Sequence, residues 1–315
     1  MLARPRRTLA CTMHLAMVQD PVTLPRSTWA LLAILTLGWG MNWPMIKMAV
    51  ADIPIWTFRA ECLAAGAAGM FSIAYATGLP MRVPRSQWRR LALVAVFNVT
   101  LWNVLVTYGV RALPSGRAAI LAYTMPLWTV LLSTALLREP LTRRRILGVA
   151  LGMAGLALLL GRELLLLRSA PLGALAILAA ALCWATGTTL MKKYPTTLST
   201  TVFTGWNFVI GGIPLVLGAL LFEHRQWHAV GNAAMVGLVY NMIVAFIICH
   251  WVWFRIVHLA PAGVSALGTL MIPVVAVFSG MALLEEKPAW SDLSALALIL
   301  AALATVLIPA RSTPR

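Results

Sequence analysis

VRALPSGRAAILAYTMPLWTVLLSTALLRE, residues 110–139, is matched 147 residues later by VHLAPAGVSALGTLMIPVVAVFSGMALLEE, residues 257–286. The two stretches share ten identical positions, and four of them are uncommon types: Pro114, Gly116, Pro126 and Glu139 in the first copy. Aliphatic identities carry little weight in so apolar a chain, but these four do. Trp39 and Lys47 also recur, 145 residues later, as Trp184 and Lys192. The pattern predicts an internal duplication, which in a membrane chain is typical of carriers built from two halves.

The composition indicates a membrane protein. The chain is 61% hydrophobic and only 11% charged, with a mean hydropathy of +0.86, and a soluble domain cannot bury that much apolar surface. Spans of roughly 19–25 apolar residues are long enough to cross a bilayer. Ten are predicted, at 28–49, 55–77, 91–111, 117–137, 144–161, 172–191, 200–222, 232–254, 262–284 and 290–309. We therefore expect an all-α membrane protein with two five-helix repeats, 28–161 and 172–309, and two cytoplasmic tails, 1–27 and 310–315.

The net charge of +16 is explained by topology rather than by nucleic-acid binding. If the N-terminus is cytoplasmic, seventeen of the 25 lysines and arginines fall in cytoplasmic segments and six on the other side. This is the positive-inside bias of membrane proteins, and it places both termini in the cytoplasm. The surplus basic residues also suit contact with anionic lipid headgroups.

The odd number of spans in each half decides how the halves are related. After five crossings the second half enters the membrane from the opposite side, so the two halves are inverted repeats. Lys47 near the outer end of the first span and Lys192 near the inner end of the sixth are placed as inversion requires.

Several motifs resemble the EamA family of the drug/metabolite transporter superfamily. They are LGWGMNWPMIK at 37–47, Phe58-Arg59-Ala60, the stretches from Met125-Pro126 to Pro140 and from Ile146 to Gly155, and Ile272-Pro273 to Lys287. The resemblance covers about residues 28–309. It implies ten helices, two inverted EamA repeats and export of small metabolites, often amino acids. The second half departs from the pattern, because Ala185-Thr186-Gly187-Thr188-Thr189 stands where the first has Asn42-Trp43-Pro44.

Three charged residues are candidates for roles inside the membrane: Lys47, Arg59 and Glu61. A charge in the hydrocarbon costs on the order of 2.5–3.5 kcal/mol on insertion scales. Arg59 and Glu61 point to opposite sides of one helix, whereas Lys47 could pair with Glu61. The alternatives are snorkelling or structural pairing on one hand, and contact with substrate or protons on the other.

Polar and aromatic residues within the spans suggest the substrate pathway. Asn98 and Trp102 share a helix face, and Asn103 corresponds to His250 at the repeat distance. The alternative for such polar groups is a hydrogen bond between helices. The predicted pathway comprises Asn42, Trp43, Lys47, Arg59, Glu61, Asn98, Trp102, Asn103, Tyr123, Trp128, Trp206, Asn207, Tyr240 and His250. If protons are coupled, Glu61 and His250 are the side chains that titrate; the alternative is facilitated diffusion.

Prolines are expected to interrupt three spans. Pro126 and Pro273 lie at equivalent positions of the fourth and ninth spans, and Pro44 lies in the first. A proline removes a backbone hydrogen bond and kinks a helix, which exposes carbonyl groups that a cavity can use. We expect these prolines to shape the pathway.

Other functional classes fit less well. The spans lack the paired acids, metal-ligand cluster or activated nucleophile of a membrane enzyme, and there is no Walker motif. A facilitative channel or scramblase-like pore is the main alternative to a secondary carrier. The expected partners are a small-molecule substrate and membrane lipid, without a cofactor, metal or nucleic acid, and the protein is a monomer or homodimer. A multi-pass protein of the bacterial cytoplasmic (inner) membrane is predicted.

Overall fold

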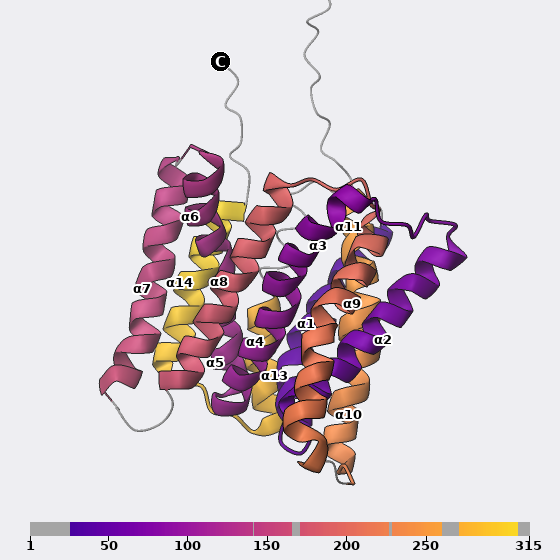
Figure 1. The fold of residues 1–315 in the computed structure, drawn as a ribbon. Coiled ribbons are helices and arrows are strands. Elements are labelled where there is room, and N and C mark those ends of the chain that lie inside the picture. The colour runs from indigo at the N-terminus through magenta and orange to yellow at the C-terminus, as the bar shows by residue number, and fades with distance from the viewer. Residues whose placement is uncertain (1–25, 141, 166–170, 227–228, 260–270, 308–315) are drawn as a thin grey trace, which may run out of the picture.

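The computed structural model describes residues 26–140, 142–165, 171–226, 229–259 and 271–307, and within these ranges all regular secondary structure is helical (Figure 1). The first repeat contains α1 (Arg26–Ala49), α2 (Ile55–Ala76), α3 (Trp88–Ala95), α4 (Trp102–Ala112), α5 (Ser115–Ala122), α6 (Met125–Leu137) and α7 (Arg143–Leu165). The second contains α8 (Pro171–Lys193), α9 (Thr200–Gly218), α10 (Asn232–Tyr240), α11 (Cys249–Leu259), α13 (Ile272–Leu284) and α14 (Trp290–Leu307).

The helices confirm the predicted all-α architecture. Among the described residues, six helical segments are long and apolar enough to cross a membrane, judged by length and composition, and α13 and α14 are shorter apolar helices. The third predicted span starts earlier than expected, because a short 3₁₀ turn at Arg85–Gln87 leads directly into α3. The start of the ninth predicted span, 262–270, lies outside the described residues.

The two repeats are inverted and pack through equivalent helices. α1 runs toward the end of the bundle where α2 begins, and α8, its equivalent, runs the other way (Figure 1). α2 packs along its equivalent α9, and α7 packs along its equivalent α14. The contact of α1 with α13 is mirrored by the contact of α8 with α6. These pairings are those expected of a two-fold axis that lies between the halves.

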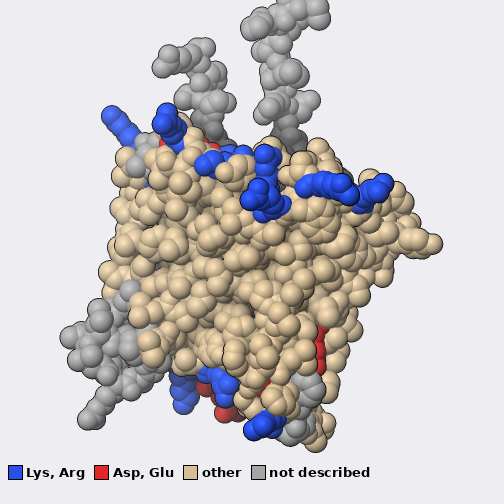
Figure 2. All heavy atoms as spheres, viewed as in Figure 1, with Lys and Arg blue, Asp and Glu red and all other residues tan. Residues whose placement is uncertain are grey.

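Basic residues gather at one end of the bundle, which we call the basic face (Figure 2). It contains Arg82, Arg85, Arg89, Arg90, Arg138, Arg143, Arg144, Arg145, Lys192, Lys193 and Arg255. The other end, the mixed face, carries acidic and basic residues together, and there Arg117 Nε pairs with Asp292 Oδ1 at 2.9 Å. Between the two faces, leucine, isoleucine, phenylalanine and tryptophan side chains are exposed, as on a surface that faces lipid.

The fourth span is divided where proline was expected to disturb it. α5 ends at Ala122, and α6 starts at Met125 with Pro126 in its first turn. α13 likewise begins with Pro273 in its first turn. Pro44 instead lies inside α1, which continues to Ala49.

The repeats also end these helices in the same way. Arg138 after α6 and Glu285 after α13 both adopt left-handed backbone conformations, with φ of 56° and 53°. The following amides of Glu139 and Glu286 then donate to the carbonyls of Ser133 and Gly280. Because a left-handed turn is costly without glycine, its presence at both equivalent sites shows that the duplicated geometry is retained.

Candidate functional site

Two equivalent spans contain π-helical segments, for which the sequence pattern offered no signal. They are Val96–Leu101 in the third span and Asn241–Ile248 in the eighth. At the repeat distance of 147 residues the first segment falls inside the second. A π-helix disturbs the regular ladder of backbone hydrogen bonds and is frequent at functional sites.

Asn103 and His250 follow these segments and bond back into them. The Asn103 Nδ2 donates to the Val99 carbonyl oxygen at 2.8 Å, and the His250 Nδ1 lies 2.8 Å from the Ala245 carbonyl oxygen. A carbonyl only accepts, so Nδ1 carries the proton, and a neutral ring then presents Nε2 as an acceptor. Each of these two nitrogens therefore bonds to its own helix, and neither side chain has a hydrogen bond to another helix within the described residues.

The His250 ring lies within an aromatic cluster that both repeats build. Its centroid is 5.5 Å from Trp39 of α1, 5.1 Å from Phe208 of α9 and 5.7 Å from Phe246 of the π-helical segment. The Trp39 indole N–H donates to the Ala245 carbonyl oxygen at 3.3 Å. We call these four residues the His250 cluster. It joins a helix of the first repeat to three segments of the second.

Arg59 of α2 is a buried cation beside this cluster. Only 2% of the residue is exposed, so snorkelling is wrong for Arg59. Its Nε donates to Thr107 Oγ1 at 2.5 Å, and its guanidinium carbon lies 4.8 Å from the Phe58 ring and 5.9 Å from the Phe246 ring. No carboxylate pairs with it within the described part of the chain.

Four asparagines bury an amide oxygen that has no hydrogen-bond partner within the described residues: Asn42, Asn98, Asn207 and Asn241. Asn207 and Asn241 donate their Nδ2 groups to carbonyls of their own helices, at 2.8 and 2.9 Å. The nitrogen must face the carbonyl, so the oxygen is the atom left over. A buried acceptor without a partner is rare in folded proteins and calls for a donor from a ligand or water.

At the mixed face, Glu286 joins the end of α13 to the start of α5. One carboxylate oxygen accepts from the Ser115 amide at 2.6 Å, and the other from Ser115 Oγ at 2.9 Å and the Gly116 amide at 3.2 Å. Lys47 interacts electrostatically with this carboxylate and donates its ammonium group to the Leu113 carbonyl oxygen. Glu286 thus caps the helix of one repeat from the other.

The equivalent glutamate is held differently at the basic face. Glu139 accepts hydrogen bonds from Lys192 and from Arg145 Nη1. The hydrogen bond from Lys192 holds the pKa of Glu139 below its usual range, although burial acts in the opposite direction. Each repeat thus supplies the lysine that faces the glutamate of the other.

Most other predicted pathway residues lie inside the bundle, at separate places. Trp43 and Tyr123 are buried in the core. The Trp102 ring packs at a tilt against Trp184 of α8, with ring centroids 5.0 Å apart, and Asn98 contacts Met191 of the same helix. The Trp128 indole N–H donates to Thr124 Oγ1 at 3.2 Å, and the Tyr240 hydroxyl donates to the Gly38 carbonyl oxygen at 2.9 Å.

Three further predicted residues, Glu61, Lys47 and Trp206, also lie away from the His250 cluster. Glu61 is exposed, because it leaves α2 on the side away from Arg59. The suggested Lys47–Glu61 pair is wrong, since Lys47 faces Leu113 and Glu286 instead. Trp206 lies toward the basic face, where its indole donates to the Met81 carbonyl oxygen at 2.9 Å and its ring contacts Trp88.

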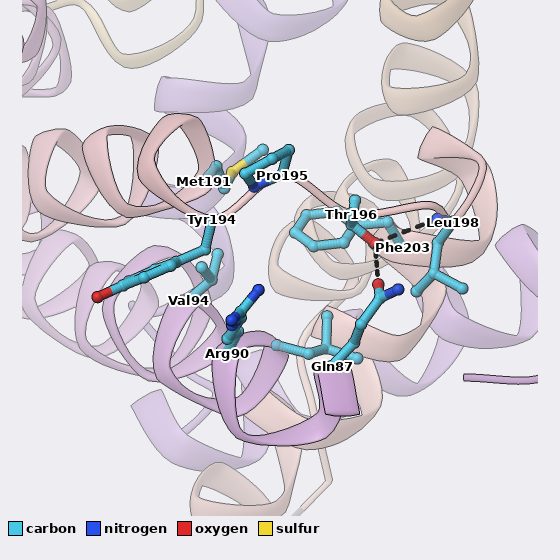
Figure 3. A pocket seen from close by; sticks show the side chains of 10 residues that line it. Gln87, Arg90, Val94, Met191, Tyr194, Pro195, Thr196, Leu198 and Phe203 are labelled. Carbon is cyan, nitrogen blue, oxygen red and sulfur yellow. Dashed lines mark hydrogen bonds between the residues drawn. The ribbon is translucent and has the colours of Figure 1, made fainter. Parts of the chain in front are cut away.

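A small pocket of about 70 Å³ opens between α3 and the end of α8 (Figure 3). The Arg90 guanidinium stacks over the Tyr194 ring at 5.2 Å, and Thr196 donates to Gln87 at 2.7 Å. The pocket holds a few water molecules at most, and it lies beside the basic face rather than at the His250 cluster. Its lining residues are Gln87, Arg90, Leu91, Val94, Met191, Tyr194, Pro195, Thr196, Leu198 and Phe203.

The chain matches the model of the EamA-like transporter family twice, over residues 27–161 and 171–308. The inverted ten-helix bundle, with aromatic and polar residues between its repeats, is the architecture of a membrane transporter. This protein belongs to the EamA-like transporter family.

Named relatives support the same class. The uncharacterized transporter YoaV of Bacillus subtilis is 25% identical over 253 residues, which cover 80% of this chain and 87% of YoaV. A probable amino-acid metabolite efflux pump of Escherichia coli is 23% identical over 294 residues, which cover 84% of this chain and 89% of the pump. A solved crystal structure shares the fold, with a TM-score of 0.64 at 22% identity, over 89% of this chain and 96% of the other.

Proposed function

We propose that this protein is a secondary carrier that exports small metabolites, amino acids above all, across the bacterial cytoplasmic membrane by alternating access. The observation that carries the proposal is the His250 cluster, because α1 of one repeat and α9 and α11 of the other meet there. A site shared by two inverted repeats is exposed to either side when the repeats rock against each other. The relatives named as probable amino-acid metabolite efflux pumps favour this substrate class.

The carrier works in our proposal by exchanging hydration for protein contacts. A substrate that leaves water regains hydrogen bonds from buried groups such as Arg59 and Asn241, while the rings of the His250 cluster contact its apolar part. Glu61 lies outside this arrangement, so uniport without a titrating carboxylate is the simpler mechanism.

Transport by purified protein in proteoliposomes should show which mechanism operates. We expect saturable efflux of amino acids and counterflow against preloaded unlabelled substrate. Glu61→Gln should transport like the unsubstituted protein at every pH, because Glu61 is exposed away from the cluster. His250→Ala should lose on the order of tenfold in flux, because three ring contacts and a backbone hydrogen bond disappear.

The Glu61→Gln/His250→Ala double variant, with and without a pH gradient, is the control for proton coupling. Each protein is compared with its own flux without a gradient, and a gradient that accelerates the unsubstituted protein but not the double variant in this comparison would overturn uniport. Linear, non-saturable flux without counterflow would identify a pore in place of a carrier.

The orientation is a second expected result. We propose that the basic face is cytoplasmic, since basic loops remain on that side during insertion. In a cysteine-free background, Arg85→Cys in intact cells should resist an impermeant maleimide, whereas Glu163→Cys should react with it. Reaction of both single variants from outside the cell would contradict this topology.

A further inference from the structure

We propose that Arg59 binds the carboxylate of the transported substrate, and that the site selects zwitterionic α-amino acids with large apolar or aromatic side chains. This inference rests on the proposed transport function and names the substrate class of that site. It starts from the charge of Arg59, which the described residues bury without neutralising.

The hydrogen bonds of Arg59 are incomplete. A guanidinium has five N–H donors in a planar fork, and the protein uses the one on Nε, for Thr107. Nη1 and Nη2 donate to no acceptor within the described residues. Thr107 Oγ1 in turn donates to the Asn103 carbonyl oxygen at 2.6 Å. This bond holds the Thr107 hydroxyl in place, and the hydroxyl orients the Arg59 guanidinium through Nε.

A carboxylate is the group that completes this arrangement. Two parallel N–H···O bonds match the guanidinium fork to a carboxylate, and the pair neutralises a charge that is costly to bury alone. The guanidinium carbon lies 4.8 Å from the Phe58 ring and 5.9 Å from the Phe246 ring, so the fork is bordered by aromatic faces. A single arginine suits a singly charged carboxylate better than a phosphate dianion, which recruits several cations.

The ammonium group of the substrate also has hydrogen-bond acceptors available. Asn241 is completely buried and Asn207 nearly so, and each presents an amide oxygen without a partner. Asn241 begins the π-helical segment that carries Phe246, and Asn207 adjoins Phe208 of the His250 cluster. Both oxygens therefore belong to the elements that carry the aromatic rings, where a substrate ammonium would need acceptors and its side chain an apolar wall.

Binding of matched ligands to purified protein in nanodiscs tests the inference. The probes are L-phenylalanine, phenylethylamine, which lacks the carboxylate, and L-phenylalaninamide, which keeps its shape without the charge. Intrinsic tryptophan fluorescence gives the dissociation constants. We expect both carboxylate-free probes to bind on the order of 100-fold more weakly than L-phenylalanine.

Arg59→Met should remove this preference, so that the three probes bind with similar, weak affinity. Arg59→Lys should restore a part of it, because an ammonium keeps the charge but loses the fork. Arg111→Met is the matched control, since Arg111 is exposed at the end of α4, and its probe affinities should equal those of the unsubstituted protein. Thermal unfolding of Arg59→Met without ligand should occur at or above the usual temperature, because an unpaired buried charge is removed.

Several results would overturn the inference. They are equal affinity for acid and amine in the unsubstituted protein, a preference that survives in Arg59→Met, no binding of L-phenylalanine, or a large loss of stability in Arg59→Met that marks a structural role. Saturable transport of neutral metabolites without a carboxylate preference would reject this role of Arg59 and leave the carrier function standing. Absence of saturable transport for every substrate would reject the carrier function itself.

Discussion

Gly237→Ala is expected to destabilise the bundle. A methyl group at Gly237 would lie 2.4 Å from the Met45 carbonyl oxygen and 2.9 Å from the Ala49 amide nitrogen. Both atoms belong to the backbone of α1, so no side-chain rotation relieves the clash. Overpacking costs about 1–3 kcal/mol even where side chains can adjust, and α10 must here move away from α1 as a whole.

Thermal unfolding in detergent, followed by circular dichroism, measures this effect. Gly212→Ala is the matched control, because its methyl group would lie 3.5 Å from the nearest atom, the Leu63 Cβ, in ordinary van der Waals contact. We expect a loss of several degrees or of soluble yield for the first variant and little change for the second. Equal unfolding temperatures in the two variants would contradict the close approach of α10 to α1.

Glu286→Gln should loosen the contact between the repeats at the mixed face. The carboxylate accepts two backbone amides and a hydroxyl from the start of α5. Hydrogen bonds to a charged group contribute about 1.5–3 kcal/mol each, and the amide keeps one acceptor oxygen of the two. We expect a loss of about 3 kcal/mol in stability, with faster hydrogen exchange at the Ser115 and Gly116 amides.

The duplication supplies the control for this prediction. Glu139→Gln changes the equivalent residue, but its partner Lys192 has a side chain that is 63% exposed. Exposed ion pairs contribute about 0–1 kcal/mol, so Glu139→Gln should unfold close to the normal temperature. A larger loss for Glu139→Gln than for Glu286→Gln would show that the inter-repeat cap is not the stronger of the two contacts.

The architecture could be predicted from sequence because the patterns that indicate it extend over many residues or involve rare residue types. Span lengths, the basic surplus on one side and the recurrence of Pro126 as Pro273 each involve many residues or rare ones. Helical spacing also predicted that Arg59 and Glu61 leave α2 on opposite sides, but the burial of Arg59 is seen only in the folded chain.

The candidate site was harder to predict from sequence, because it is formed by contacts between segments that are distant along the chain. Phe208 and Phe246 are ordinary apolar residues in sequence, yet they enclose His250. The π-helical segments have no compositional signature. The suggested Lys47–Glu61 pair is wrong because the carboxylate that interacts with Lys47 is that of Glu286, which is distant in the sequence. Such partners are set by helix packing rather than by local pattern.

The packing of α2 on α9 and of α7 on α14 also bears on the history of the chain. Equivalent helices that contact each other are what a two-fold homodimer produces, so a five-helix ancestor inserted in both orientations would form the same interfaces. In such a dimer every substitution appears twice. Once the copies are joined, each position can change alone, and the present chain has His250 in one half where the other has Asn103, and Gly280 where the other has Ser133. A joined chain can therefore place different residues at equivalent depths of its two halves, as it does within the third and eighth spans.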